Sequence, residues 1–334
     1  MPTAQTRRRF VAALSLAAAG GLIRPSPAAG AEGTPETTTL RLTRTPSLCS
    51  APQYIAEELL RAEGFSDVRY VDTASATESA NAIGRDEADL SFDFVSAFII
   101  AIDAGAPITV LGGVHIGCYE LFASEGIRTI TGLMGKSVGL DAAAPALLSL
   151  LAAEVGLDPE KDIRWVTGAD PSVHPLELFA AGKIDAYLGL PPEPQILHAR
   201  KVGHVILRTA VDRPWSEYFC CMLAGNRDYV RRHPAATKRV IRAFLKAADL
   251  CARAPEQAAR TLVEGGFTDR YEYALETLNE NPYGGWRDYG AEDSVRFYAL
   301  RLHDLGFVKS SPQKVLTEAT DFRFFDQLTR ELKA

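Results

Sequence analysis

Apolar residues in the first two-thirds of the chain form short runs that predict alternating strands and helices. A strand is expected at 40–43, followed by a helix that Ser50 caps and Gly64 ends. The elements expected next are a strand at 68–71, a short helix opened by the capping box Ser75-Ala76-Thr77-Glu78, and a strand beginning at 88–92. This order is typical of an α/β unit with a parallel sheet.

The same order of elements returns about 96 residues later, which indicates an internal repeat. The expected elements are a strand at 137–140, a helix from Pro145 to Gly156, a strand at 163–166, a short helix at 175–181 and a strand at 184–188. Ala88-Asp89 aligned with Ile184-Asp185 is the best identity between the two units. The pattern therefore predicts two α/β units that are built alike.

Two β-prone runs, at 108–124 and 218–225, are each long enough to cross from one unit to the other. After Asn226 the pattern becomes helical, and the further helices expected to pack on the first unit lie at 256–264, 269–280, 291–305 and 320–332. We therefore predict an α/β clamshell of two lobes joined by two crossover strands. The first lobe comprises 39–118 and 222–334, and the second comprises 119–221.

The N-terminal segment has the pattern of an export signal. Arg7-Arg8-Arg9-Phe10 precedes an apolar run at 12–23 and a small-residue cleavage site at Ala29-Gly30-Ala31. The run is too short and too rich in Ala and Gly for a membrane span. We expect residues 1–31 to be a twin-arginine signal peptide and the mature protein to lie in the periplasm.

Charge and cysteine content narrow the classes of partner. The net charge of −6 without a basic stripe speaks against nucleic acid. Five cysteines are an odd number for an exported chain, and a disulfide between the neighbours Cys220 and Cys221 would be strained. Cys251 fits the buried face of a helix. Neither a metal nor a cofactor is expected.

Four segments carry a resemblance to a known family: 88–92, 135–140, 181–188 and the Pro191-Pro192-Glu193-Pro194 stretch. In order and spacing the chain resembles the periplasmic substrate-binding proteins of ABC importers of the nitrate/sulfonate/taurine type. That group also includes binders of thiamine-pyrimidine precursors. The resemblance implies a periplasmic binding protein-like fold, a monomer, and an ABC permease with its ATPase as partners.

Loops at the carboxyl ends of the strands should line the cleft. Arg44, Thr45 and Ser47 follow the first strand, and Arg44 either offers a fork to an anion or lies in solvent. Asp93 either caps the next helix or faces the cleft, where it would favour an N–H donor over a simple anion. Leu190 precedes the Pro191-Pro192 pair in the second unit.

Further candidates lie near the second helix start and the crossovers. Free N–H groups at Ala143 and Ala144 would attract an anion. His115 either contacts the ligand or serves as a structural hydrogen-bonding group. Trp215 and Tyr218 either stack on a planar ligand or pack between elements. An aromatic loop with Tyr283, Trp286 and Tyr289 forms either a lid or a packed surface.

The sequence predicts a solute-binding component that captures a small organic anion of the sulfonate, nitrate or aromatic carboxylate class. The alternatives are a pyrimidine-binding protein, a synthase-like enzyme of the same fold, and a sensor that docks on a membrane receptor. Fungal pyrimidine synthases carry a Cys-rich, iron-associated motif, but the nearest segment here, Phe219-Cys220-Cys221-Met222, has only two cysteines. No hydrolase, zinc-protease or P-loop pattern is present, so no catalytic residue is expected.

Overall fold

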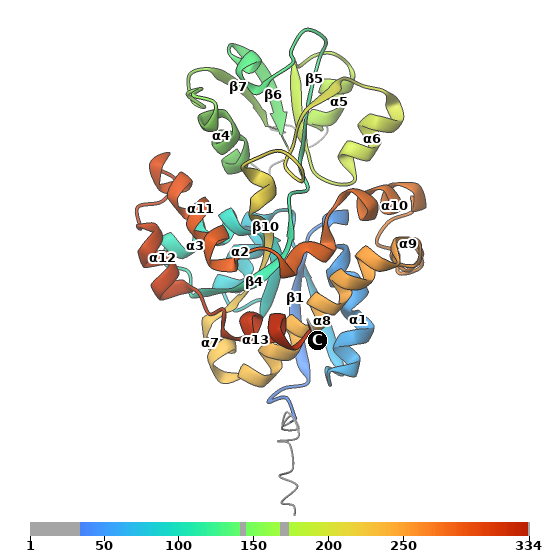
Figure 1. Ribbon diagram of the computed structural model, residues 1–334, viewed down its shortest axis with the longest axis vertical. Helices are drawn as coiled ribbons and strands as arrows, with labels where there is room; N and C mark the ends of the chain where they lie inside the picture. Colours follow the sequence, from blue (N-terminus) through green and yellow to red (C-terminus); the bar gives the residue numbers. More distant parts are fainter. Residues whose placement is uncertain (1–33, 141–144, 168–173, 333–334) are drawn as a thin grey trace, which may run out of the picture. The chain divides into compact units, whose positions relative to one another are not determined.

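The computed structural model describes residues 34–140, 145–167 and 174–332, within which the strands form two five-stranded sheets (Figure 1). The first sheet has the order β2-β1-β3-β10-β4 and comprises β1 (Thr39–Arg44), β2 (Asp67–Asp72), β3 (Leu90–Phe94), β4 (Ile108–Ile116) and β10 (Phe219–Asn226). The second has the order β7-β6-β8-β5-β9 and comprises β5 (Glu120–Ala123), β6 (Lys136–Leu140), β7 (Ile163–Thr167), β8 (Ala186–Gly189) and β9 (His204–Arg208). The expected signal peptide lies outside the described residues.

The helices follow the strands in a repeated order. Before β4 lie α1 (Ala51–Ala62), α2 (Ala76–Gly84) and α3 (Val95–Asp103); between β6 and β9 lie α4 (Pro145–Glu154), α5 (Pro175–Ala180) and α6 (Glu193–Arg200). After β10 come α7 (Arg227–Arg232), α8 (Pro234–Arg253), α9 (Pro255–Glu264), α10 (Tyr271–Glu280), α11 (Ala291–Asp304), α12 (Pro312–Ala319) and α13 (Arg323–Glu331). Short 3-10 helices are η1 (Leu48–Ser50), η2 (Ile130–Leu133), η3 (Trp215–Glu217) and η4 (Tyr283–Arg287). No described helix has both the length and the apolar character needed to span a membrane.

The predicted internal repeat is confirmed by the hydrogen bonding of the two sheets. In the first sheet β1 pairs in parallel with β2 and β3, and in the second β6 pairs in parallel with β7 and β8. Arg41 N donates to Asp89 Oδ2 at 2.7 Å, and Ser137 N donates to Asp185 Oδ2 at 2.8 Å. Both pairs are 48 residues apart in sequence. The two aspartates therefore have the same role in the two units.

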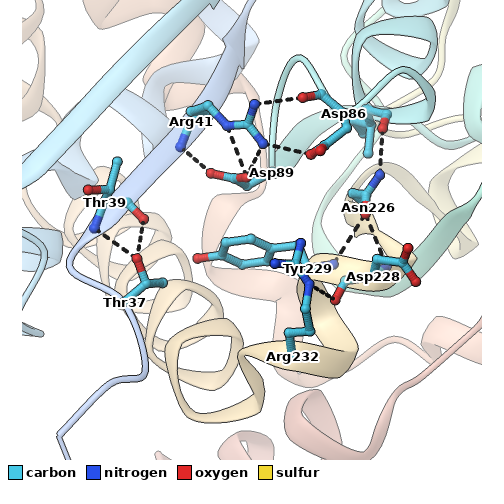
Figure 2. A network of polar contacts seen from close by, with 10 residues as sticks. Thr37, Thr39, Arg41, Asp86, Asp89, Asn226, Asp228, Tyr229 and Arg232 are labelled. Carbon is cyan, nitrogen blue, oxygen red and sulfur yellow. Dashed lines mark hydrogen bonds and ion pairs between the residues drawn. The ribbon is translucent and has the colours of Figure 1, made fainter.

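The Arg41 side chain adds an ion-pair network to the first of these sites (Figure 2). Its guanidinium donates to Asp89 Oδ1 and Asp86 Oδ1, each at 2.7 Å from Nη2. Asn226, whose N–H donates to Asp89 O at 2.9 Å, also donates from Nδ2 to Ile83 O at 3.0 Å, and its Oδ1 caps α7. These contacts tie β1, α2 and the end of β10 together.

Removing the Asp89 carboxylate should destabilise the fold more than removing its counterpart. We expect Asp89→Ala to lower the free energy of unfolding by about 2 kcal/mol, because the Arg41 amide loses its acceptor and the guanidinium keeps only Asp86 as a partner. Asp185→Ala should cost about 1 kcal/mol, because it removes the hydrogen bonds of Ser137 and a long, exposed ion pair with Lys136. Urea unfolding of both variants measures the difference, and equal losses would contradict this account of the network.

The two crossovers lie side by side and are hydrogen-bonded to each other. The chain leaves the first sheet at 117–119, between β4 and β5, and returns through 209–218, between β9 and β10. Thr209 Oγ1 accepts hydrogen bonds from the N–H groups of Cys118 and Tyr119 at 3.1 and 2.9 Å. The run expected to make the second crossing, 218–225, corresponds to β10, which lies wholly in the first sheet between β3 and β4.

Gly117 allows the close approach of these two segments. It has φ +33°, and a Cβ atom built there would lie 2.3 Å from Ala210 N and from the carbonyl carbon of Thr209. Real Cβ atoms do not come this close to backbone atoms. Only glycine therefore fits at this position of the crossover.

The helical C-terminal part packs on the first sheet, as expected. Helix α8 packs on α1, α11 packs on α3, and α13 packs on β4. The expected helices at 256–264, 269–280, 291–305 and 320–332 correspond to α9, α10, α11 and α13. Helix α12 was not predicted, because the chain there offers a short apolar pattern of only two turns. The fold class predicted from the sequence is confirmed.

Candidate functional site

A small cavity lies where the loops after β1 and β3 approach a loop of the second unit. Four of the residues proposed from the sequence line it: Thr45, Ser47, Asp93 and Leu190. The wall also contains residues that were not predicted as ligand contacts, among them Cys49, Ser75, Tyr119 and Cys221. Because β1 and β3 are parallel, their carboxyl ends bring Thr45 and Asp93 to the same edge of the sheet.

Asp93 is a charged side chain in the wall of this cavity. Its Oδ1 accepts from Phe94 N at 2.9 Å and its Oδ2 accepts from Thr45 Oγ1 at 3.3 Å. The N-cap of α3 is Phe94, and no side chain caps that helix, so the capping interpretation of Asp93 is wrong. Burial raises the pKa of Asp93 to about 6. Both oxygens of this carboxyl already accept one hydrogen bond from the protein.

The loop after β1 contacts the second unit directly. Leu48 N donates to Pro191 O at 3.0 Å, and Ser47 Oγ lies 3.0 Å from the same oxygen. From the other side, the hydroxyl of Tyr283 donates to Cys49 O at 3.1 Å. These bonds fix the loop between β1 and α1 and place Leu190 in the cavity wall.

Arg44 is not among the residues that line this cavity. Its Nε donates to Asp72 Oδ1 at 2.6 Å, and its guanidinium lies 5.3 Å from the centre of the Tyr70 ring. It borders a separate surface hollow with Tyr54 and Phe267. Of the two interpretations of Arg44, neither a fork into this cavity nor a side chain free in solvent describes it, because its guanidinium pairs with the Asp72 carboxylate of β2.

His115 belongs to the core. It is completely buried in β4, its Nδ1 lies 3.0 Å from Ile116 O, and its ring packs edge-on against Phe92 and Tyr283. Its Nε2 has no hydrogen-bond partner among the described residues. The structural interpretation of this histidine fits these contacts better than direct contact with a solute.

The other aromatic candidates pack against helix α11. Trp215 is buried with its ring 5.4 Å from that of Phe297, and Tyr218 stacks on the same ring at 3.8 Å. Neither lines the cavity, so the packing interpretation fits them. Tyr283 and Trp286 are buried as well. Ala143 and Ala144 lie outside the described residues.

Four buried cysteines form a cluster at the wall of the cavity. The Sγ atoms of Cys49, Cys118 and Cys221 all lie within 4.8 Å of one another. Cys220 Sγ is 3.6 Å from Cys118 Sγ and 3.7 Å from Cys221 Sγ. Hydrogen bonds from Cys118 and Cys221 hold the pKa of Cys49 well below its usual range. The contact with Cys220 raises the pKa of Cys118, and the contact with Cys118 raises the pKa of Cys221.

The thiol cluster was not predicted, although the sequence held a signal for it. Cys49 follows β1, Cys118 lies in the first crossover, and Cys221 is in β10. Each of these segments was expected to approach the boundary between the two units. The predicted topology, unlike the spacing of the cysteines in the sequence, therefore indicates that these three cysteines lie near one another.

Comparison with known proteins places these observations in a family. Residues 33–264 match the model of the NMT1-like family, whereas no curated protein matches the chain. The solved structures that it resembles include the periplasmic nitrate-binding protein NrtA from Synechocystis PCC 6803, with 16% identity, 90% of both chains covered and a TM-score of 0.75.

Two further structures have the same fold. The alkanesulfonate-binding protein SsuA from Xanthomonas axonopodis pv. citri, bound to MOPS, is 17% identical, with 86% of this chain and 99% of that chain covered and a TM-score of 0.71. A Candida albicans gene product described as having the generic periplasmic binding protein fold is 15% identical, with 85% and 96% covered and a TM-score of 0.64. The chain thus has the periplasmic binding protein fold and belongs to the NMT1-like family.

Proposed function

We propose that the protein is the solute-binding component of an ABC importer, which takes up a small solute in the periplasm and delivers it to a permease and its ATPase. The family and the fold support this role. The observation that carries it is the cavity at the carboxyl ends of β1 and β3, which Leu190 of the second unit closes. In open α/β sheets this edge is where ligands bind.

We infer that the solute carries an N–H donor, as an aminopyrimidine does. Asp93 is the only carboxyl side chain among the described residues that line the cavity, and neither Lys nor Arg is among them. The hydroxyls of Thr45, Ser47 and Ser75 add polar contacts that can donate or accept. A small organic anion, which the sequence favoured through Arg44, would meet the Asp93 carboxylate there without a compensating cation among these residues.

The mechanism we propose is closure of the two lobes around the solute. The crossovers at 117–119 and 209–218 would act as the hinges, since they connect the two sheets. Because β10 belongs to the first sheet from Phe219 onward, we place the second lobe boundary before that residue and not at 221. No chemical step is required for this function.

A thermal-shift screen of the mature chain tests the solute class. We expect an aminopyrimidine to raise the melting temperature by several degrees, since a ligand at a hundredfold excess over its Kd stabilises the native state by about 2.7 kcal/mol. Taurine, alkanesulfonates, nitrate and phthalate-like acids should give no shift. A shift with one of these anions alone would overturn the inferred solute class but support the role in solute binding.

Arg44→Ala separates the two interpretations of that residue. Because Arg44 pairs with Asp72 at the surface, we expect the variant to keep its affinity for the solute within about twofold and to lose less than about 1 kcal/mol of stability. Titration calorimetry with the solute found in the screen measures the affinity, with Thr45→Val, in the cavity wall, as the variant that should weaken binding. Loss of solute binding in Arg44→Ala would show that Arg44 contributes to the binding site.

A further inference from the structure

The thiols of Cys49, Cys118 and Cys221 come from three separate parts of the chain. They lie in η1, in the first crossover and in β10, and all three residues are buried. Side chains next to each other in a regular strand point to opposite faces of the sheet. The pairing of β10 with β4 shifts register between Phe219 and Met222, and this irregularity brings Cys220 and Cys221 to the same thiol cluster.

The spacing of these sulfur atoms suits a metal ion. Three thiolates bound to Zn²⁺ at about 2.3 Å would lie about 3.8 Å apart in tetrahedral geometry. The Sγ atoms already lie within 4.8 Å of one another, so small side-chain rotations would close the site. A set of three thiolates without a carboxylate favours a soft or borderline cation over Mg²⁺ or Ca²⁺.

The net charge of the occupied site distinguishes Zn²⁺ from Cu⁺ as its ion. Three thiolates carry three negative charges, so Zn²⁺ leaves a net charge of −1 in a buried site, whereas Cu⁺ leaves −2. The Asp93 carboxylate lines the same cavity as Cys49 and Cys221 and adds to the negative potential. The divalent ion is therefore the better match.

We propose that Cys49, Cys118 and Cys221 form a Zn²⁺ site at the base of the cavity. Two of the three ligands border the cavity, which gives the ion an entry path and leaves one coordination position for water or for the solute. Ser47 Oγ, 3.1 Å from Cys49 Sγ, orients that ligand. The proposal does not depend on the identity of the solute or on the role in import.

Cobalt binding to the reduced mature protein is the test. In the presence of a phosphine reductant, Co²⁺ should give the thiolate-to-metal absorption of a tetrahedral site, and one equivalent of Zn²⁺ should abolish it. Cys49→Ala, Cys118→Ala and Cys221→Ala should each weaken Zn²⁺ binding at least about a hundredfold. Cys251→Ala is the matched control, because Cys251 is equally buried but lies in α8 and outside the cluster.

Several results would overturn the assignment. These are the absence of cobalt absorption in the reduced wild-type chain, equal binding by Cys49→Ala and Cys251→Ala, or an iron–sulfur spectrum of the purified protein. A thiol titration of the denatured protein without a reductant that finds fewer than five free thiols would indicate a disulfide in the cluster in place of a metal site. If a variant at Cys118 fails to fold, Cys49→Ser tests the same site from the loop before α1. Thermal shifts with the solute are recorded separately, so the two proposals can fail independently.

Discussion

Gly117→Ala is expected to lower the free energy of unfolding by about 4 kcal/mol, the largest loss that we expect from a single methyl group in this chain. The added Cβ would overlap the backbone at Thr209 and Ala210, and neither the φ of +33° nor the hydrogen bonds of Thr209 leave room for an adjustment. The two crossovers would have to separate. With an unfolding entropy of about 2.1 cal/mol/K per residue over about 300 residues, the melting temperature should fall by about 6 °C.

Gly126→Ala is the matched control for this variant. Gly126 also has a positive φ, of +93°, but a Cβ built there meets no atom within 4 Å. Its replacement should cost about 1 kcal/mol, from backbone strain alone. Calorimetric melting of both variants measures the difference. Equal losses would show that the contact between the crossovers contributes nothing beyond the conformation of the glycine.

Asp93→Asn is expected to stabilise the protein at neutral pH and to lower its affinity for the solute by about a hundredfold. The amide keeps the geometry of the side chain and removes a charge from a poorly hydrated position. The loss of affinity follows because a charged hydrogen bond to the solute contributes about 1.5–3 kcal/mol. Stability and binding should therefore change in opposite directions.

The gain in stability should depend on pH with a defined sign. The carboxyl loses its proton near pH 3.8 in an unperturbed chain and near pH 6 in the folded protein. Between these values the folded state binds more protons at Asp93, so the contribution of this carboxyl to the free energy of unfolding falls as pH rises from about 4 to about 6, and then stays level. The shift corresponds to about 3 kcal/mol. The variant should be more stable than the wild type above pH 6 and equal to it near pH 4.

Thermal melts at pH 4 and pH 7.5, with and without the solute, measure both effects. Asp72→Asn is the control, because its carboxylate is exposed and pairs with Arg44, away from the cavity. Its pKa is lowered by Arg44, so this variant should lose a little stability at neutral pH and keep the solute affinity. A stability difference between Asp93→Asn and wild type that does not change with pH would refute the buried-charge argument.

The sequence predicted the repeated architecture because its signals are local. Alternation, caps and glycine stops are encoded within each element, and the Asp89 and Asp185 equivalence marked the register of the two units. What it did not predict depends on contacts between distant segments. The place of β10 in the middle of the first sheet follows from pairing with β3 and β4, for which strand propensity carries no signal.

The candidate site was predicted in part for the same reason. Loop positions after β1 and β3 followed from topology, so Thr45, Ser47 and Asp93 were found. The direction of a long side chain could not be predicted from topology, and Arg44 in fact pairs with Asp72 on the neighbouring strand. Nor did the sequence reveal the thiol cluster, which arises from an irregularity in β10 and from the crossover that carries Cys118.

The place of β10 also determines the order in which the protein can fold. This strand fills the gap between β3 and β4, yet it follows the whole second unit in the chain. A nascent chain that ends before Phe219 leaves one edge of β3 unpaired and β4 without its strand partner, and such edges invite pairing with other chains. The second unit, which is contiguous in sequence, can complete its sheet first. The N-terminal unit therefore needs protection from aggregation until synthesis has passed that strand.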